Sequence, residues 1–125
     1  MTERTNPVGW FEIPVADMAR ATAFYEKVLG VSLAPMTMGP AEMAMFAAEP
    51  ALPGAGGCLI HTDGYSPSHA GSLVYFSVQD IEATLRRVQA GGGRTLVPKM
   101  SIGEHGFIAH FEDPEGNRVA LHALQ

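Results

Sequence analysis

Cysteine and basic residues are scarce in this chain, and each scarcity excludes a class of protein. Cys58 is the only cysteine among 125 residues, so no disulfide can form within one chain. The 8 lysines and arginines are outnumbered by 13 aspartates and glutamates, which gives a formal net charge of −5. Non-specific nucleic-acid binding needs a basic face, so we expect no nucleic-acid partner.

Long apolar runs are also missing. No stretch approaches the roughly 18 residues that a membrane-spanning helix needs, so we expect no membrane partner. Residues 1–7 lack the apolar region of a secretion signal, which makes the cytoplasm the expected location. Apolar residues nevertheless make up 46% of the chain, and charged residues only 17%. This composition favours a single folded domain over residues 1–125.

The apolar pattern predicts the same order of elements in each half of the chain: strand, helix, strand, strand, strand. The predicted helices begin after Asp17 and Asp80, which are typical N-cap residues, and end at Gly30 and at Gly91-Gly92-Gly93. Asp113-Pro-Glu-Gly116 predicts a tight turn between two apolar strands. The predicted strands are residues 8–14, 31–34, 43–48, 58–61, 72–78, 95–97 and the two arms of a hairpin over 107–122.

The two halves form an internal repeat. At an offset of 63 the first half matches the second from Val15 and Val78 to Gly30 and Gly93. Near the ends, at an offset of 61, the matching pairs are Leu59 with Ala120 and His61 with His122. A half of this size buries little core alone. We therefore predict an α+β fold of two βαβββ modules, residues 8–64 and 71–124, whose mixed sheets enclose a groove.

Two such modules closed by Asp113-Pro-Glu-Gly-Asn117 resemble the vicinal oxygen chelate superfamily, which includes glyoxalase I, bleomycin-resistance proteins and extradiol dioxygenases. The other motifs that carry the resemblance are Phe11-Glu-Ile-Pro-Val-Ala-Asp17, Phe24-Tyr25 with Leu29-Gly30, Val78-Gln-Asp80, and Gly91-Gly92-Gly93. The resemblance implies the glyoxalase/bleomycin-resistance/dioxygenase fold, a small organic ligand, and a homodimer that completes its grooves by pairing.

Metal-using members of that superfamily place one ligand on each of four strands. By motif position, the resemblance puts those ligands at Trp10, Leu59, Leu73 and Ala120. None of these side chains can ligate a divalent metal. We therefore expect no metal at this place and no cofactor.

Strand alternation predicts which side chains share the groove with the former metal position. They are Trp10, Glu12, Leu59, His61, Leu73, Tyr75, Ala120 and His122. Glu12, His61 and His122 are the candidate catalytic residues, because a carboxyl in an apolar groove or a histidine pair can exchange protons. The other five are the candidate substrate-binding residues.

Each of these interpretations has a simpler alternative. The histidines can lie solvated at strand ends, or ligate a metal together with Glu12, and Glu12 can be satisfied by Tyr75 or by backbone N–H groups. Trp10 and Tyr75 suit stacking on a planar ligand, but filling of a core or interface fits them equally well. Two further segments have a functional and a simpler interpretation. Met36, Met38, Met43 and Met45 form either an adaptable pocket wall or ordinary strand and loop packing. Glu104-His105-Gly106 forms either a lid or a plain exposed loop.

Three functions remain open from the sequence. The first is a glyoxalase-like, metal-independent lyase or isomerase that acts on a small carbonyl or aromatic compound. The second is a ligand-sequestering protein of the bleomycin-resistance type, and the third is a dimeric interaction module. An enzyme needs Glu12 and a histidine within reach of one ligand atom, whereas a binder needs only shape and aromatic walls.

Overall fold

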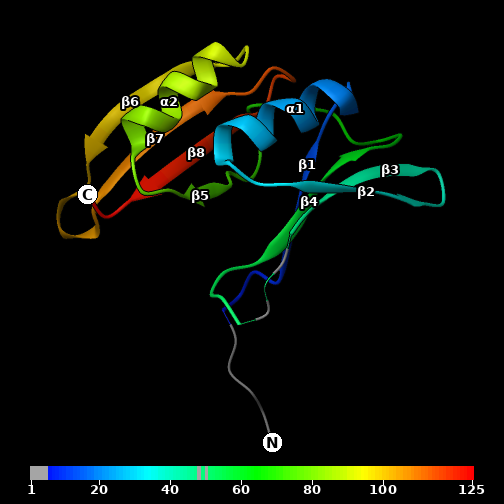
Figure 1. Ribbon diagram of the computed structural model, residues 1–125, viewed down its shortest axis with the longest axis horizontal. Coiled ribbons are helices and arrows are strands. Elements are labelled where there is room, and N and C mark those ends of the chain that lie inside the picture. The colour runs from blue at the N-terminus through cyan, green and yellow to red at the C-terminus, as the bar shows by residue number, and fades with distance from the viewer. Residues whose placement is uncertain (1–5, 48, 50) are drawn as a thin grey trace, which may run out of the picture.

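Two four-stranded sheets, each covered on one face by a helix, make up the fold (Figure 1). The computed structural model describes residues 6–47, 49 and 51–125. Two sequence predictions fall partly outside the described residues. They are the end of the third predicted strand, at Ala48, and the expectation that residues 1–7 form no secretion signal, of which residues 1–5 are not described. The first module contains β1 (Trp10–Pro14), α1 (Met18–Leu29), β2 (Leu33–Met38), β3 (Ala41–Phe46) and β4 (Gly56–His61). The second contains β5 (Tyr75–Ser77), α2 (Ile81–Ala90), β6 (Arg94–Ser101), the short 3₁₀ helix η1 (Gly103–His105), β7 (Phe107–Glu112) and β8 (Arg118–Ala123). The predicted α+β fold with two βαβββ patterns is confirmed.

The helices begin and end where the sequence predicted. The Asp17 carboxylate accepts a hydrogen bond from the Arg20 amide at 3.0 Å, and Asp80 accepts from the Ala83 amide at the same distance. Gly30 ends α1 in the left-handed conformation, with φ of 67°, which glycine adopts without strain. Neither helix in the described part of the chain has the length and apolar character that crossing a membrane requires.

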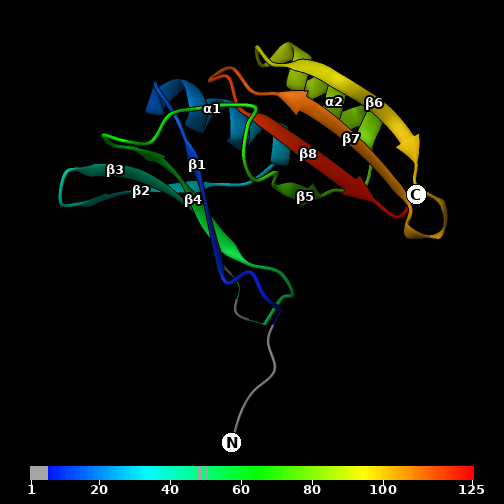
Figure 2. The ribbon, with the colours of Figure 1, turned by 180° about the vertical axis from the view of Figure 1, so that it is seen from behind.

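The two sheets have the same internal order. It is β1-β4-β3-β2 in the first and β5-β8-β7-β6 in the second, and the parallel pairs are β1 with β4 and β5 with β8. The edge strands β1 and β5 face one another between the two sheets (Figure 1), where the rings of Phe11 and Phe76 meet with centroids 5.7 Å apart. Figure 2 shows the opposite side, where each sheet presents a face that no helix covers; we call these the uncovered faces.

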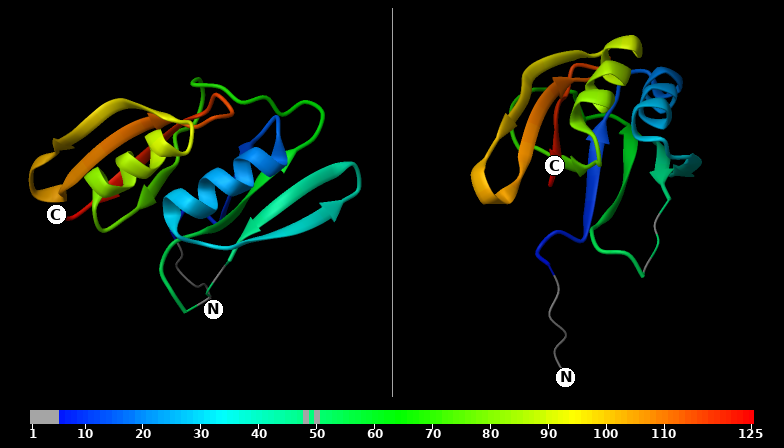
Figure 3. Two further views of the ribbon diagram at one scale, coloured as in Figure 1. Left: turned by 45° about the horizontal axis from the view of Figure 1, so that its top comes forward. Right: turned by 60° about the vertical axis from the view of Figure 1, so that its left-hand side comes forward.

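One apolar core joins the two modules. Helices α1 and α2 lie side by side over the sheets (Figure 3), and one cluster of buried side chains contains residues from both helices and both sheets. Phe24 of α1, for example, packs against Phe111 of β7 with ring centroids 6.0 Å apart. Burial of apolar surface is the main force that stabilises a fold. Each module therefore depends on the other for part of its stability.

The register of β4 differs from the prediction by one residue. Glu12 pairs with Cys58 in the first module, just as Tyr75 pairs with Ala120 in the second. The amides of Val15 and Val78 donate equivalent hydrogen bonds, both 2.9 Å long, to the carbonyls of Ile60 and His122. The structural equivalent of Ala120 is thus Cys58, and the predicted match with Leu59 is wrong. Because side chains alternate along a strand, this slip exchanges the two faces of β4.

Candidate functional site

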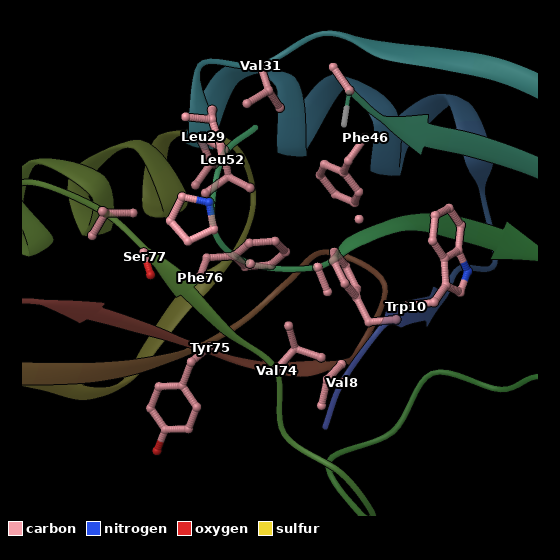
Figure 4. Close-up of a pocket in the computed structure, with 18 of the residues that line it drawn as sticks. Val8, Trp10, Leu29, Val31, Phe46, Leu52, Val74, Tyr75, Phe76 and Ser77 are labelled. Carbon is pink, nitrogen blue, oxygen red and sulfur yellow. The ribbon is translucent and has the colours of Figure 1, made fainter. Parts of the chain in front are cut away.

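A cavity of about 1560 Å³ lies between the modules, and we call it the inter-module cavity. Its walls come from β1, β5, the facing ends of α1 and α2, and the loop between β3 and β4. Figure 4 shows Phe46, Phe76, Leu29, Val31 and Leu52 gathered around one part of it. Small-molecule sites are usually concave and combine apolar side chains with polar groups. This cavity has both, because Glu12, Asp80 and Arg87 also line it.

Three phenylalanines form a triangle in the wall of this cavity. The ring centroids of Phe11, Phe46 and Phe76 are 5.6 to 5.7 Å apart in every pair, within the range of favourable aromatic contacts. They come from β1, β3 and β5, so the triangle exists only when both modules are together. The Phe11 ring lies over Gly57, where any side chain would collide with it. A glycine at position 57 is therefore required for this ring position.

Trp10 and Tyr75 line the cavity from different strands and are both about half exposed, at 43% and 48%. Figure 4 shows them well apart, with Tyr75 on the opposite side of β5 from Phe76. The indole N–H of Trp10 donates to Oε2 of Glu12 at 3.4 Å. Four of the predicted groove residues, Trp10, Glu12, Leu73 and Tyr75, therefore line the same cavity, although Trp10 and Tyr75 do so at different places.

Glu12 lies on the uncovered face beside the buried thiol of Cys58, with Oε2 and Sγ 4.0 Å apart. Burial, and then the charge of Glu12, raise the pKa of the Cys58 thiol to about 11. The thiol is therefore protonated at neutral pH, and it donates a weak hydrogen bond to the carboxylate. One alternative to a catalytic role was that Tyr75 or backbone N–H groups satisfy Glu12, but its hydrogen-bond partners among the described residues are Trp10 and Cys58.

Leu59 and His61 do not line the groove, so their predicted positions are wrong. Leu59 is fully buried in the core under the helices, at 0% exposure, while Cys58 and Ile60 pack with Met43 on the uncovered face. His61 shares the face of Leu59, and its Nδ1 lies 2.9 Å from the carbonyl oxygen of Val15. The cause is the one-residue register difference in β4, which places Glu12 and His61 on opposite faces of the sheet.

His122 and Ala120 do lie on the uncovered face of the second sheet, together with Tyr75. Ala120 is fully buried by its neighbours. His122 Nε2 lies 2.7 Å from the carbonyl oxygen of His105, so this nitrogen carries a proton and donates it. That bond ties η1 to β8. The structure therefore does not bring His61 and His122 together, and neither of them lines the cavity that Glu12 lines.

His110 of β7 does not line the cavity but contacts Tyr75, which does, and the prediction missed it. Its Nε2 lies 3.3 Å from the Tyr75 hydroxyl, and its Nδ1 accepts a 3.0 Å hydrogen bond from Nε of Arg118. A signal for it was present in the sequence. The tight turn at 113–116 pairs β7 with β8, and this pairing puts His110 opposite Ala120.

The register of β4 changes one of the four positions to which the resemblance assigns metal ligands. With the corrected register these positions are Trp10, Cys58, Leu73 and Ala120. Only the side chain of Cys58 has an atom that can ligate a metal ion, and its thiol is protonated at neutral pH. Within residues 6–47, 49 and 51–125, no three His, Cys, Asp or Glu side chains gather closely enough to hold a metal ion.

Comparisons with known proteins agree on one family. The family model described as the glyoxalase/bleomycin resistance protein/dioxygenase superfamily matches residues 8–121. A glyoxylase-like domain-containing protein from Didymella fabae is 30% identical over 118 residues, which is 91% of each chain. The chain spans 46% of the length of relatives from Mycobacterium bovis and Mycobacterium tuberculosis, to which it is 27% identical. The chain is also similar to TnmS3, an antibiotic binding protein from a Streptomyces species whose crystal structure is known. The two sequences are 26% identical, and the two structures align with a TM-score of 0.66 over 98% of each chain.

Proposed function

The chain belongs to the glyoxalase/bleomycin resistance protein/dioxygenase superfamily, and from this premise we propose that it binds a small, flat, largely apolar organic molecule in the inter-module cavity. The proposed role is binding without a covalent step and without the superfamily's metal. Trp10, Leu73 and Tyr75 are proposed to contact the ligand.

The triangle of Phe11, Phe46 and Phe76 is the observation that carries this proposal. Aromatic rings offer rigid apolar surface that favours contact with another ring. They line a space large enough for a molecule of several fused rings. The 26% identity to an antibiotic binding protein, over nearly the full length of both chains, supports the same conclusion.

The separation of the candidate proton-transfer groups favours binding over catalysis. A general acid or base must come within hydrogen-bond reach of the reacting atom, at about 2.6–3.2 Å. Glu12 lies on one face of the first sheet and His61 on the other. His122 already donates its Nε2 proton to the His105 carbonyl. The rival function is an enzyme in which Glu12 alone moves a proton of a carbonyl compound.

Titration with 2-ethylnaphthalene tests binding, because Trp10 is the only tryptophan and lines the cavity. We expect quenching of Trp10 emission that saturates, and about tenfold weaker binding by the Phe46→Ala variant, or ~1.4 kcal/mol. Phe107→Ala is the matched control, because Phe107 is a partly buried core phenylalanine outside the cavity wall. Equal weakening by both variants, or no saturation in the wild type, would contradict the proposal.

Proton exchange separates the rival function from the proposed one. An enzyme in which Glu12 removes a proton beside a carbonyl would exchange the acetyl protons of 2-acetylnaphthalene for deuterium in D₂O. We expect an exchange rate equal to that in buffer, and no difference between the wild type and Glu12→Gln. Exchange that the wild type accelerates and Glu12→Gln abolishes would establish the enzyme instead.

A further inference from the structure

We infer that Tyr75, His110 and Arg118 form a hydrogen-bonded chain that presents the phenolic proton of Tyr75 to a carbonyl oxygen of the ligand. This inference rests on the proposed function, because it names the chemical class of the planar molecule that the cavity takes. The three residues come from β5, β7 and β8 and lie on the uncovered face of the second sheet.

The small side chain of Ala120 makes the chain of contacts possible. On the central strand β8, Ala120 pairs with Tyr75 on one side and with His110 on the other. A larger side chain there would stand between the two rings. With alanine, the rings of Tyr75 and His110 meet edge to face across β8, with centroids 5.8 Å apart and planes at 82°.

Arg118 fixes which nitrogen of His110 carries the proton. An arginine side chain is always charged in proteins, and its Nε–H can only donate. Because this group lies 3.0 Å from Nδ1 of His110, that nitrogen must accept and cannot carry a proton. Burial, and then the charge of Arg118, lower the pKa of His110, which keeps the ring neutral at neutral pH. The proton of the neutral ring is therefore on Nε2.

The orientation of His110 determines what the Tyr75 hydroxyl does. The Nε2–H of His110 donates to the phenolic oxygen at 3.3 Å, so the hydroxyl cannot donate its own proton to that nitrogen. Tyr75 is 48% exposed and lines the inter-module cavity. The phenolic proton is therefore directed toward an acceptor outside the protein. Hydrogen bonds that polarise one another in this way strengthen the terminal donor.

A neutral carbonyl oxygen fits this donor better than a carboxylate. Glu12 lines the same cavity and would repel a second negative charge, as would the net charge of −5. Arg118 lines an adjoining pocket of about 220 Å³, which Glu12 also lines, and its Nε is already engaged with His110. The ligand class is thus a planar aromatic ketone, aldehyde or quinone. Its oxygen would lie at the Tyr75 hydroxyl, and its ring system on the same side of β5, in the part of the cavity that Trp10 and Leu73 line.

Two probes of matched shape test this inference. The wild type is expected to bind 2-acetylnaphthalene about tenfold more tightly than 2-ethylnaphthalene, and Tyr75→Phe to remove that preference without weakening the ethyl probe. Equal affinity of the wild type for the two probes would overturn the carbonyl site and leave the proposed function intact. Failure of both probes to bind would overturn both proposals.

Nitrogen-15 NMR of the His110 ring gives a readout that packing alone would not move. We expect the Nε2–H tautomer in the wild type. Arg118→Met should raise the pKa of His110, mix the two tautomers and reduce the preference for the ketone. Arg94→Met is the matched control, because Arg94 lies on the same sheet but pairs with Glu112. An Nδ1–H tautomer in the wild type, or identical effects of the two arginine variants, would overturn the inference.

Discussion

The hydroxyl of Tyr25 in α1 donates a 2.6 Å hydrogen bond to Oδ2 of Asp113, which is 88 positions later in the chain. Both residues are buried, and burial followed by the Asp113 charge raises the pKa of Tyr25 well above its ordinary value. Asp113 opens the turn that closes the second module, so this bond crosses between modules. The motif that carried the family resemblance thus has a structural role in joining the two halves.

The rest of that turn makes similar contacts with the first module. The side-chain amide of Asn117 donates to the carbonyl of Pro14 at 2.7 Å. The carboxylate of Glu115 accepts from the amides of Ala16 and Asp17, just before α1, and pairs with Arg20. The hairpin turn therefore satisfies backbone groups at the start of α1 that would otherwise lack partners.

Replacement of Tyr25 by phenylalanine should lower the free energy of unfolding by about 1–3 kcal/mol, because Asp113 would lose a buried partner. Urea denaturation followed by circular dichroism measures this change. Tyr65→Phe is the control, since Tyr65 is a loop tyrosine that is 47% exposed, and it should change stability by less than about 0.5 kcal/mol. Similar results for the two variants would contradict the role of the Tyr25–Asp113 bond.

Acid should weaken the fold through Glu115. Burial raises the pKa of this carboxyl, but hydrogen bonds from Arg20, Asp17 and Ala16 outweigh it, so the net shift is downward. A carboxyl whose folded pKa is depressed stabilises the fold above its unfolded pKa, about 4.3, and this stability is lost as the pH falls through the folded pKa. The stability difference between wild type and Glu115→Gln should therefore be greatest above about pH 4.5 and shrink below it. A constant difference for Glu115→Gln across this pH range would refute the linkage.

Alanine at position 61 should leave ligand affinity unchanged, because His61 lies on the opposite face from Glu12. The expected cost is structural and at most about 1 kcal/mol, from loss of the contact with the Val15 carbonyl. Trp10→Phe is the comparison that should weaken binding of 2-ethylnaphthalene, measured by calorimetry because the tryptophan is then absent. A fall in affinity for His61→Ala as large as that for Trp10→Phe would instead support the position in the groove that strand alternation predicted for His61.

A homodimer remains a prediction, and the uncovered face of the first sheet is where we expect the second copy to pack. Met36 and Met38 are 44% and 60% exposed there, above the buried Met43, Cys58 and Ile60. Light scattering at micromolar concentration should give twice the 13.3 kDa of one chain. Met38→Glu should shift the protein toward monomer, because it would place a charge in that contact. Lys27→Glu, on the exposed side of α1, should not, and a monomeric wild type would contradict the prediction.

The sequence by itself determined the order of elements, both helix N-caps, the closing turn and which side chains of β8 lie on each face of the second sheet. These features depend on residues close together in the sequence. Asp17 and Asp80 each cap a helix by accepting a hydrogen bond from an amide three residues later, and the turn at 113–116 sets the register of β7 against β8. His110 was within reach of the same argument, because that register places it opposite Ala120.

Only the tertiary structure decided the faces of β4 and the position of the cavity. Cys58, Leu59 and Ile60 are all apolar and all buried, so no alternation distinguishes the two faces. The partner of β4 is β1, a parallel strand far away in sequence, and no tight turn fixes their register. The register is fixed instead by packing, with Leu59 in the core under α1 and the Phe11 ring lying over Gly57. The inter-module cavity likewise forms between β1 and β5, two edge strands whose relative position depends on how the helices of both modules pack together.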